Sequence, residues 1–175
     1  RRCAVVREPG GTPVGEKIRD ILLDSSNTID PKCEMLLYMA SRAQLVVDKL
    51  KPLLAAGKIV LCDRYLYSSC AYQGVAGGVG LNNVFTVGRI ATSGLTPDLV
   101  LILDLPVGTA FKRASAKTKD RMESKGKAFY ESVRRGFLAV AKILGRKAAV
   151  IDADRPADTI HGDIWQILTR RHLIS

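Results

Sequence analysis

Residues 58–74 carry the sequence KIVLCDRYLYSSCAYQG. The run Ile59–Cys62 is apolar and has the length of a strand that is buried on both faces. Asp63 and Arg64 follow directly, where such a strand should end. In open parallel α/β sheets, ligands bind beyond the carboxyl ends of the strands. This stretch therefore predicts a buried parallel strand with a polar site at its end.

The pair Asp63 and Arg64 has two interpretations. A carboxylate can hold Mg²⁺ directly or through water, and a guanidinium can bind a phosphate through two hydrogen bonds, so the pair suits a metal-bound, phosphorylated ligand. Alternatively, the two side chains cap the next helix. The local sequence does not decide between these interpretations.

Three other apolar runs share this pattern and also reach charged residues at their carboxyl ends. They are Cys3–Val6, Leu99–Leu103 and Ala148–Ile151, which run into Arg7-Glu8, Asp104 and Asp152. Helical spacing or helix-start signals between them predict helices over residues 13–22, 31–56, 66–73, 82–91, 107–116, 129–144 and 157–168. The glycine-rich residues 74–80 predict a mobile surface loop. Alternating strands and helices in 175 residues predict one α/β domain, with a parallel sheet covered by helices on both faces.

The formal net charge of the chain is +10. Residues 112–135 contain nine Lys or Arg and three Asp or Glu, so one segment holds most of the excess. A balance of this kind favours an anionic partner, such as nucleotide phosphates, a nucleic acid or a membrane surface. The segment 117–127 has weak apolar periodicity and is predicted to be a basic loop between two helices.

The chain has four cysteines and no CxxC spacing. This pattern favours buried, free thiols in a reducing cytoplasm over disulfides or a zinc site. We see no apolar run near the roughly 18 residues of a membrane span, and no signal peptide.

The predicted helix over residues 31–56 places Tyr38 and Arg42 one turn apart. The two side chains could line a pocket in which Tyr38 stacks on a base and Arg42 hydrogen-bonds to it. The alternative is a core tyrosine with an arginine whose head group reaches solvent. Arg19 has a similar ambiguity, because it lies off the apolar stripe of its helix and is either a solvated cation or a ligand for an anion.

Five stretches together resemble thymidylate kinases, the enzymes that phosphorylate dTMP. They are REPGGTP at 7–13, YMASR at 38–42, the residues 63–74 quoted above, PDLVLILD at 97–104, and the segment 120–130 with DRME and Phe129-Tyr130. Each motif is weak alone, but all five occur in the order of the family and span most of the chain. Within the family, REPGG in the first motif resembles the bacterial type of thymidylate kinase.

The resemblance implies a P-loop kinase-like fold with a five-stranded parallel sheet. The implied reaction transfers the γ-phosphoryl group of ATP to dTMP, giving dTDP, with Mg²⁺ as the metal. It also implies a cytoplasmic homodimer that acts on ATP and dTMP, and no membrane or nucleic-acid partner is expected.

The same resemblance implies roles for single residues. Around the acceptor nucleotide, Arg19 and Glu8 lie at the monophosphate, Tyr38 stacks on thymine, Arg42 hydrogen-bonds to the base edge, and Ser69 and Gln73 complete the base and sugar contacts. For the transfer step, Arg64 bridges the acceptor phosphate and the transferring group, Asp63 supports Mg²⁺, and Arg121 is catalytic. Lys117, Lys119 and Arg121 belong to a lid at about residues 117–127 that closes over ATP.

The chain departs from the family at one place. The 175 residues contain no strand, glycine-rich loop with Gly-Lys-Ser/Thr, and helix ahead of Arg7. Without that segment, the remaining strands are expected to lose pairing partners. Two interpretations follow: the chain is part of a complete thymidylate kinase, or it is an inactive remnant that still binds thymidine nucleotides. A third, from another class, is a basic nucleic-acid-binding protein.

Overall fold

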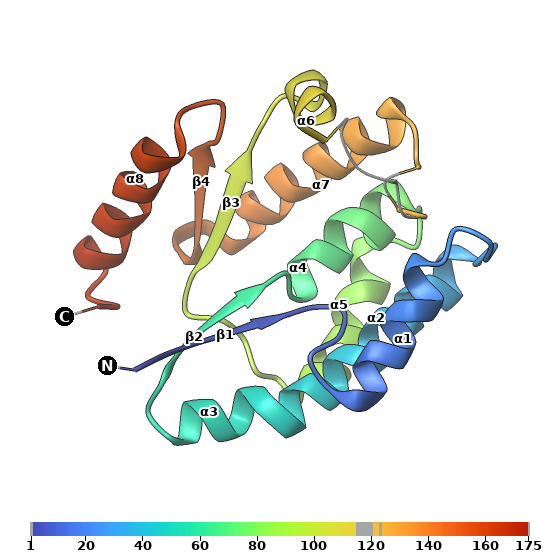
Figure 1. Cartoon of the computed structure of the whole chain (residues 1–175), viewed down its shortest axis with the longest axis horizontal. Helices are drawn as coiled ribbons and strands as arrows, with labels where there is room; N and C mark the ends of the chain where they lie inside the picture. The colour runs from blue at the N-terminus through green and yellow to red at the C-terminus, as the bar shows by residue number, and fades with distance from the viewer. Residues whose placement is uncertain (1, 115–120, 123, 175) are drawn as a thin grey trace.

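The computed structural model describes residues 2–114, 121, 122 and 124–174. Its strands are β1 (Cys3–Arg7), β2 (Ile59–Asp63), β3 (Val100–Asp104) and β4 (Ala148–Asp152). All four predicted strands are confirmed, with ends that differ by at most one residue. β1 pairs with β2 and β3 pairs with β4, both in parallel (Figure 1).

The two strand pairs form separate sheets, where the sequence predicted one. Among the described residues, no strand of one pair bonds to a strand of the other. Leu61 in β2 and Leu103 in β3 are 50% and 55% exposed, although their runs are typical of strands buried on both faces. The α/β class with parallel strands is confirmed.

The helices are α1 (Pro13–Leu23), α2 (Pro31–Leu45), α3 (Lys51–Ala55), α4 (Leu66–Ser69), α5 (Leu81–Thr92), α6 (Val107–Ala114), α7 (Lys127–Leu144) and α8 (Ala157–Arg170). Two π-helical segments, η1 (Val46–Leu50) and η2 (Cys70–Ala76), join α2 to α3 and extend α4, and the 3₁₀ turn η3 (Gly145–Lys147) precedes β4. The helix predicted over residues 31–56 is therefore one helical stretch, interrupted by a π-helical segment.

The predicted surface loop from Gly74 to Gly80 is wrong in its first part. Gly74 belongs to η2 and is buried, and a Cβ atom on it would meet the side chain of Val84 at 3.3 Å. Val79 is buried as well. The glycine that suggested a loop instead allows η2 to lie close against α5.

Residues 115–120 and 123 lie outside the described residues. The end of the helix predicted over 107–116 and most of the predicted lid at 117–127, including Lys117 and Lys119, fall there. Of that lid, the structure describes residues 121, 122 and 124–127.

Helix α7 connects the part of the molecule that contains β1 and β2 with the part that contains β3 and β4. It packs against η2 and α4 on one side and against β3, β4 and α6 on the other. Gly136 allows the close approach to η2, because a Cβ atom there would lie 2.8 Å from the Cα atom of Ala71. At β3, Arg134 donates two hydrogen bonds, of 2.7 and 2.8 Å, to the Asp104 carboxylate. These hydrogen bonds lower the pKa of Asp104.

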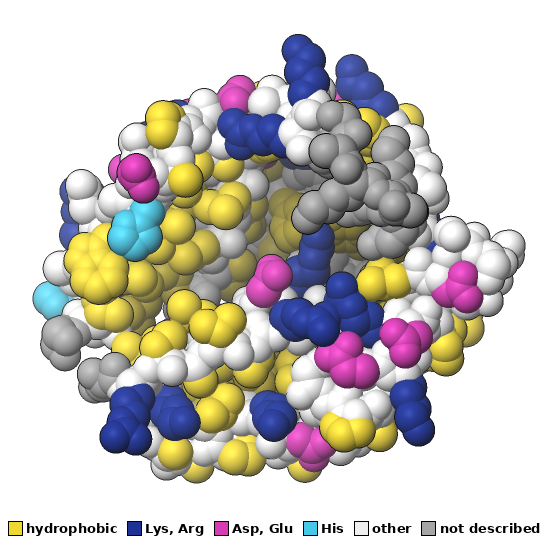
Figure 2. Space-filling view, in the orientation of Figure 1, with side chains coloured by type: hydrophobic (Ala, Val, Ile, Leu, Met, Phe, Trp, Pro, Cys, Tyr) yellow, Lys and Arg dark blue, Asp and Glu magenta, His cyan; other side chains and the backbone are white. Residues whose placement is uncertain are grey.

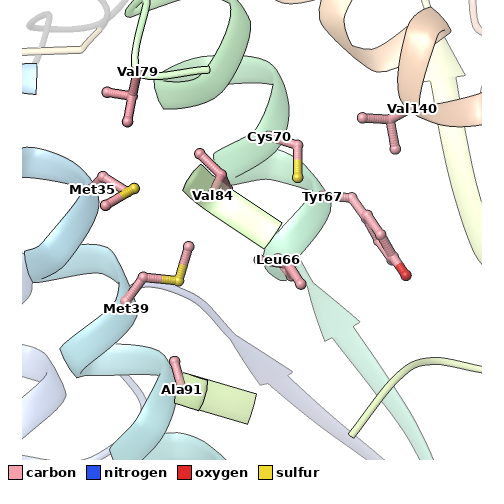
Figure 3. Packing of buried hydrophobic residues seen from close by; sticks show 9 residues of the cluster. All are labelled: Met35, Met39, Leu66, Tyr67, Cys70, Val79, Val84, Ala91 and Val140. Atoms are coloured by element: carbon pink, nitrogen blue, oxygen red, sulfur yellow. The ribbon is translucent and has the colours of Figure 1, made fainter. Parts of the chain in front are cut away.

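The main hydrophobic core lies between α2, α4, η2, α5 and α7 (Figure 3). Its buried residues are Met35, Met39, Leu66, Tyr67, Cys70, Val79, Val84, Ala91 and Val140. The second cluster, formed by Leu45, Val46 and Leu50, packs against Val6 of β1 and Val60 of β2. The second cluster holds α2 and η1 against the β1–β2 pair, and the main core holds η2 against α2 and α5.

The strand registers bring the charged carboxyl ends together in pairs. Arg7 lies opposite Asp63, and Asp104 lies opposite Asp152. The space-filling view shows a hollow between the two parts of the molecule, with hydrophobic side chains on one side and Lys and Arg side chains on the other (Figure 2).

Candidate acceptor-nucleotide site

A cavity of about 230 Å³ lies between the β1–α1 turn, α2, α4 and η2, and residues near the start of α7. Its walls contain all of the side chains that the sequence assigned to the acceptor nucleotide: Glu8, Arg19, Tyr38, Arg42, Ser69 and Gln73. Arg64 lines it too. The structure thus brings together residues that lie up to 65 positions apart in the chain.

The polar floor of this cavity is a buried cluster around Arg42. Its Nε atom donates to Oε2 of Glu8 at 2.8 Å, and another guanidinium nitrogen donates to Oγ of Ser69 at 3.1 Å. Arg42 is only 1% exposed, so the alternative in which it reaches solvent is wrong. Burial raises the pKa of Glu8, and the charge and hydrogen bond of Arg42 act against this shift. Among the described residues, Oε1 of Glu8 has no hydrogen-bond partner.

A second buried carboxylate, Glu34, lies beside this cluster and was missed by the sequence analysis. It accepts a hydrogen bond from Nε2 of Gln73 at 2.8 Å and forms an ion pair with Arg121 at 2.6 Å. Glu34 precedes Tyr38 by four residues and Arg42 by eight on the same helical stretch, so the spacing of α2 could have identified it.

Arg121, assigned to the lid over ATP, is 9% exposed in this structure. Besides Glu34, its Nε atom donates to the carbonyl oxygen of Leu22 at 2.7 Å, and its backbone N–H donates to Leu23 at 3.2 Å. These bonds attach the segment before α7 to the end of α1. Met122 and Tyr130 also line the cavity. Both belong to the motif at 120–130, but the sequence predicted no role for them at the acceptor nucleotide.

Arg64 occupies a left-handed backbone conformation at the end of β2, with φ +65°. Such a conformation is uncommon for residues other than glycine, and it occurs more often at functional sites. The guanidinium lies 5.0 Å from the ring centre of Tyr72. Tyr65 is the N-cap residue of α4 and makes no side-chain cap hydrogen bond, so the structure gives no support to a helix-capping role for Asp63 and Arg64.

The turn from β1 to α1 presents Arg19 to the cavity. Thr12 caps α1, because its Oγ1 accepts from the N–H of Gly15 at 2.9 Å. One guanidinium nitrogen of Arg19 donates to the carbonyl oxygen of Pro9 at 3.0 Å, which leaves other donors of the group for an anion. Tyr38 also lines the cavity, and burial raises the pKa of its hydroxyl to about 12.

Asp63 is an exposed carboxylate at the end of β2. In the described part of the chain, no three His, Cys, Asp or Glu side chains cluster as a metal site would need. A single carboxylate still fits Mg²⁺ in a nucleotide site, because this ion keeps several waters and takes most other ligands from phosphates. The described helices include none that is long and apolar enough to cross a membrane.

All four cysteines are free, as predicted. Their predicted burial is only partly correct, since Cys70 is buried and Cys62 is partly buried, but Cys3 and Cys33 are exposed. Cys33 lies in the first turn of α2.

Comparisons with known proteins identify the family of the chain. The family model for thymidylate kinase matches residues 1–164. A thymidylate kinase of Thermoanaerobacter sp. (strain X514) is 44% identical over 166 residues, which are 95% of this chain and 82% of that protein. The enzyme of Caldanaerobacter subterraneus subsp. tengcongensis is 46% identical over 90% of this chain and 76% of its own length, and that of Deinococcus radiodurans is 44% identical over 95% and 82%. The chain therefore belongs to the thymidylate kinase family.

Proposed function

We propose that the cavity around Arg42 is the dTMP site of a thymidylate kinase. Members of this family transfer the γ-phosphoryl group of ATP to dTMP, giving dTDP, and this chain shares that activity through its family. The observation that carries the site assignment is the convergence of Glu8, Arg19, Tyr38 and Arg42 on one cavity.

The cavity lining combines two kinds of side chain, which suit the phosphate and the nucleoside of the nucleotide. Arg19 and Arg64 supply cationic donors for the monophosphate. Tyr38 supplies a flat, partly buried ring for stacking on the base, and Arg42, Ser69 and Gln73 supply hydrogen-bonding groups for the base and sugar. Glu8 holds Arg42 in place through the buried ion pair.

For the transfer step, phosphoryl transfer needs positioning and positive charge around a developing anion. We assign Arg64 to the bridge between the acceptor phosphate and the transferring group, and Lys117 and Lys119 to contacts with ATP. Arg121, which forms an ion pair with Glu34 in this structure, would contact ATP as a catalytic lid residue only after that ion pair opens. Mg²⁺, when bound, would neutralise phosphate charge, with Asp63 as its protein ligand or as a partner of its waters. The protein groups orient the acceptor and exclude water from it.

The proposal includes a homodimer in the cytoplasm. Exposed apolar side chains on neighbouring helices support the dimer: Leu36 on α2, Val47 on η1 and Ile90 on α5 are 53%, 59% and 74% exposed, and α2 packs against α5. A second copy of the chain would cover these side chains. We call this set the α2–α5 apolar face.

Calorimetric titration with dTMP and with thymidine tests the site. Arg19→Met should weaken dTMP binding by about 10- to 100-fold, because a charge-assisted hydrogen bond to the phosphate is lost. Thymidine, which has no phosphate, should bind the variant and the unaltered chain alike. Arg135→Met, on the exposed side of α7, is the matched control. If Arg19→Met weakened the binding of dTMP and of thymidine equally, Arg19 would not act on the phosphate.

A coupled assay of the complete protein with ATP, Mg²⁺ and dTMP tests the reaction, and turnover on the order of 1–100 s⁻¹ is expected. The same assay on these 175 residues separates the kinase from a nucleotide-binding remnant. Replacing dTMP by dUMP measures tolerance for the missing methyl group. Binding of duplex DNA with a steep salt dependence, together with no binding of dTMP, would instead identify a nucleic-acid-binding protein.

A further inference from the structure

Glu34 presents both of its carboxylate oxygens to donors. Oε1 accepts from Nε2 of Gln73 at 2.8 Å, and Oε2 lies 2.6 Å from a guanidinium nitrogen of Arg121 and 3.6 Å from Nζ of Lys125. The side chain of Glu34 is 4% exposed. A buried carboxylate of this kind requires charge compensation, and the two cations provide it.

A carboxylate can only accept hydrogen bonds, so it determines which end of a neighbouring amide faces it. The NH₂ group of Gln73 must point toward Glu34. The carbonyl oxygen of the amide is then directed away from Glu34, and Gln73 lines the cavity. In the described part of the chain, that oxygen makes no hydrogen bond.

We propose that Glu34 is a positioning residue that fixes the Gln73 amide with its carbonyl oxygen toward the base of the nucleotide. This inference rests on the proposed dTMP site. A fixed acceptor at this position selects a base that offers a ring N–H. Thymine and uracil carry such a donor at N3, whereas N3 of cytosine is an acceptor and would face the carbonyl oxygen lone pairs.

Arg121 makes this selection sensitive to the charge of Glu34. In a Glu34→Gln variant, the single side-chain oxygen is required by Arg121, because a guanidinium has only donors. The new NH₂ group then faces Gln73, whose amide must turn its own oxygen toward it. Gln73 would consequently direct its NH₂ group at the base. The site would then favour a base whose N3 is an acceptor, as in cytosine, over a base that carries an N–H at N3.

The test compares dissociation constants for dTMP and dCMP by calorimetry in the unaltered protein and in Glu34→Gln. In Glu34→Gln, we expect dTMP binding to weaken at least tenfold, because the NH₂ group of Gln73 would face the N3–H of thymine in place of a hydrogen bond. The ratio of dCMP to dTMP affinity should rise at least tenfold. Glu131→Gln on α7 is the matched control and should change neither value. An unchanged ratio in a folded Glu34→Gln variant would overturn the proposal.

A double-mutant cycle separates positioning from a general structural effect. In a Gln73→Met background, which has no amide, Glu34→Gln should leave the dCMP to dTMP ratio unchanged. If the ratio still shifts tenfold in that background, Glu34 acts through something other than Gln73 and the proposal is wrong.

A measurement on the unaltered protein applies even if Glu34→Gln does not fold. The side-chain amide protons of Gln73, assigned in ¹⁵N-labelled protein by their loss in Gln73→Met, should exchange slowly with water because they are bonded to Glu34. Fast exchange would contradict the geometry. If the unaltered protein binds neither nucleotide, the dTMP site itself is wrong. If it binds dTMP and the ratio does not respond to Glu34→Gln, only the role of Glu34 is wrong.

Discussion

At the scale of single residues, the acceptor cavity depends on a buried ion pair that supports both binding and folding. Arg42 and Glu8 are 1% and 4% exposed, and their side chains approach to 2.6 Å. Removing one partner of such a pair leaves the other charge buried and uncompensated. Arg42 is therefore a structural residue as well as a candidate base contact.

Arg42→Ala should lower the free energy of unfolding by about 3 kcal/mol, because the Glu8 carboxylate is left without its cation. Urea denaturation of the chain measures this change. Arg135→Ala on the exposed side of α7 should change stability by no more than about 0.5 kcal/mol. Equal stability of the two variants would show that Glu8 does not depend on Arg42.

The cysteines give a pH-dependent prediction. Burial raises the pKa of Cys62 and of Cys70 to about 12, so both thiols stay protonated at pH 8. Cys3 and Cys33 are exposed. A disulfide reagent such as DTNB should modify two thiols quickly at pH 8 and all four after unfolding. Because the thiolate is the reactive form, the two slow rates should rise about tenfold per pH unit between pH 7 and pH 9. Four equally fast thiols in the folded chain would contradict this assignment.

At the scale of elements, the contact between α7 and η2 depends on the absence of a side chain at Gly136. The backbone of Ala71 leaves no space for a Cβ atom there. By contrast, a Cβ atom on Gly162, in α8, would meet nothing within 4 Å. The two glycines thus form a matched pair, one required by packing and the other not.

Gly136→Ala should destabilise the protein by about 1–3 kcal/mol, because α7 must move away from η2. Gly162→Ala should stabilise it by up to about 1 kcal/mol, since alanine favours the helix more than glycine does. Thermal unfolding of both variants measures the difference. A stabilising Gly136→Ala would mean that α7 can shift without cost.

The sequence predicted strands and long helices well, because their apolar periodicity and their capping residues are local signals. The start of α1 follows from Thr12 and Pro13, and β2 follows from Ile59–Cys62. Glu34 was missed, since its role depends on Gln73 and Arg121, which are 39 and 87 positions away. The burial of Gly74 was missed for a similar reason, because it depends on α5. Motifs located most of the cavity, but its hydrogen-bond network required the tertiary structure.

At the scale of the whole molecule, the α2–α5 apolar face predicts self-association. Val47→Asp would place a charge on this face, and we expect the variant to be monomeric where the unaltered protein is dimeric, as measured by size-exclusion chromatography with light scattering. Ile143→Asp, an equally exposed apolar position on α7, is the matched control and should remain dimeric. A monomeric unaltered protein would contradict the dimer.

The position of α7 between the two strand pairs has a consequence for how chain length can vary. An inserted residue in an α-helix rotates everything after it by about 100° and advances it by 1.5 Å. Within α7, such an insertion after Arg134 would turn Val140 out of the core while Arg134 stayed bonded to Asp104. We therefore expect insertions and deletions to be excluded between Arg134 and Leu144. The exposed turn at Asp24–Ser26 has no such constraint, and differences in length can accumulate there.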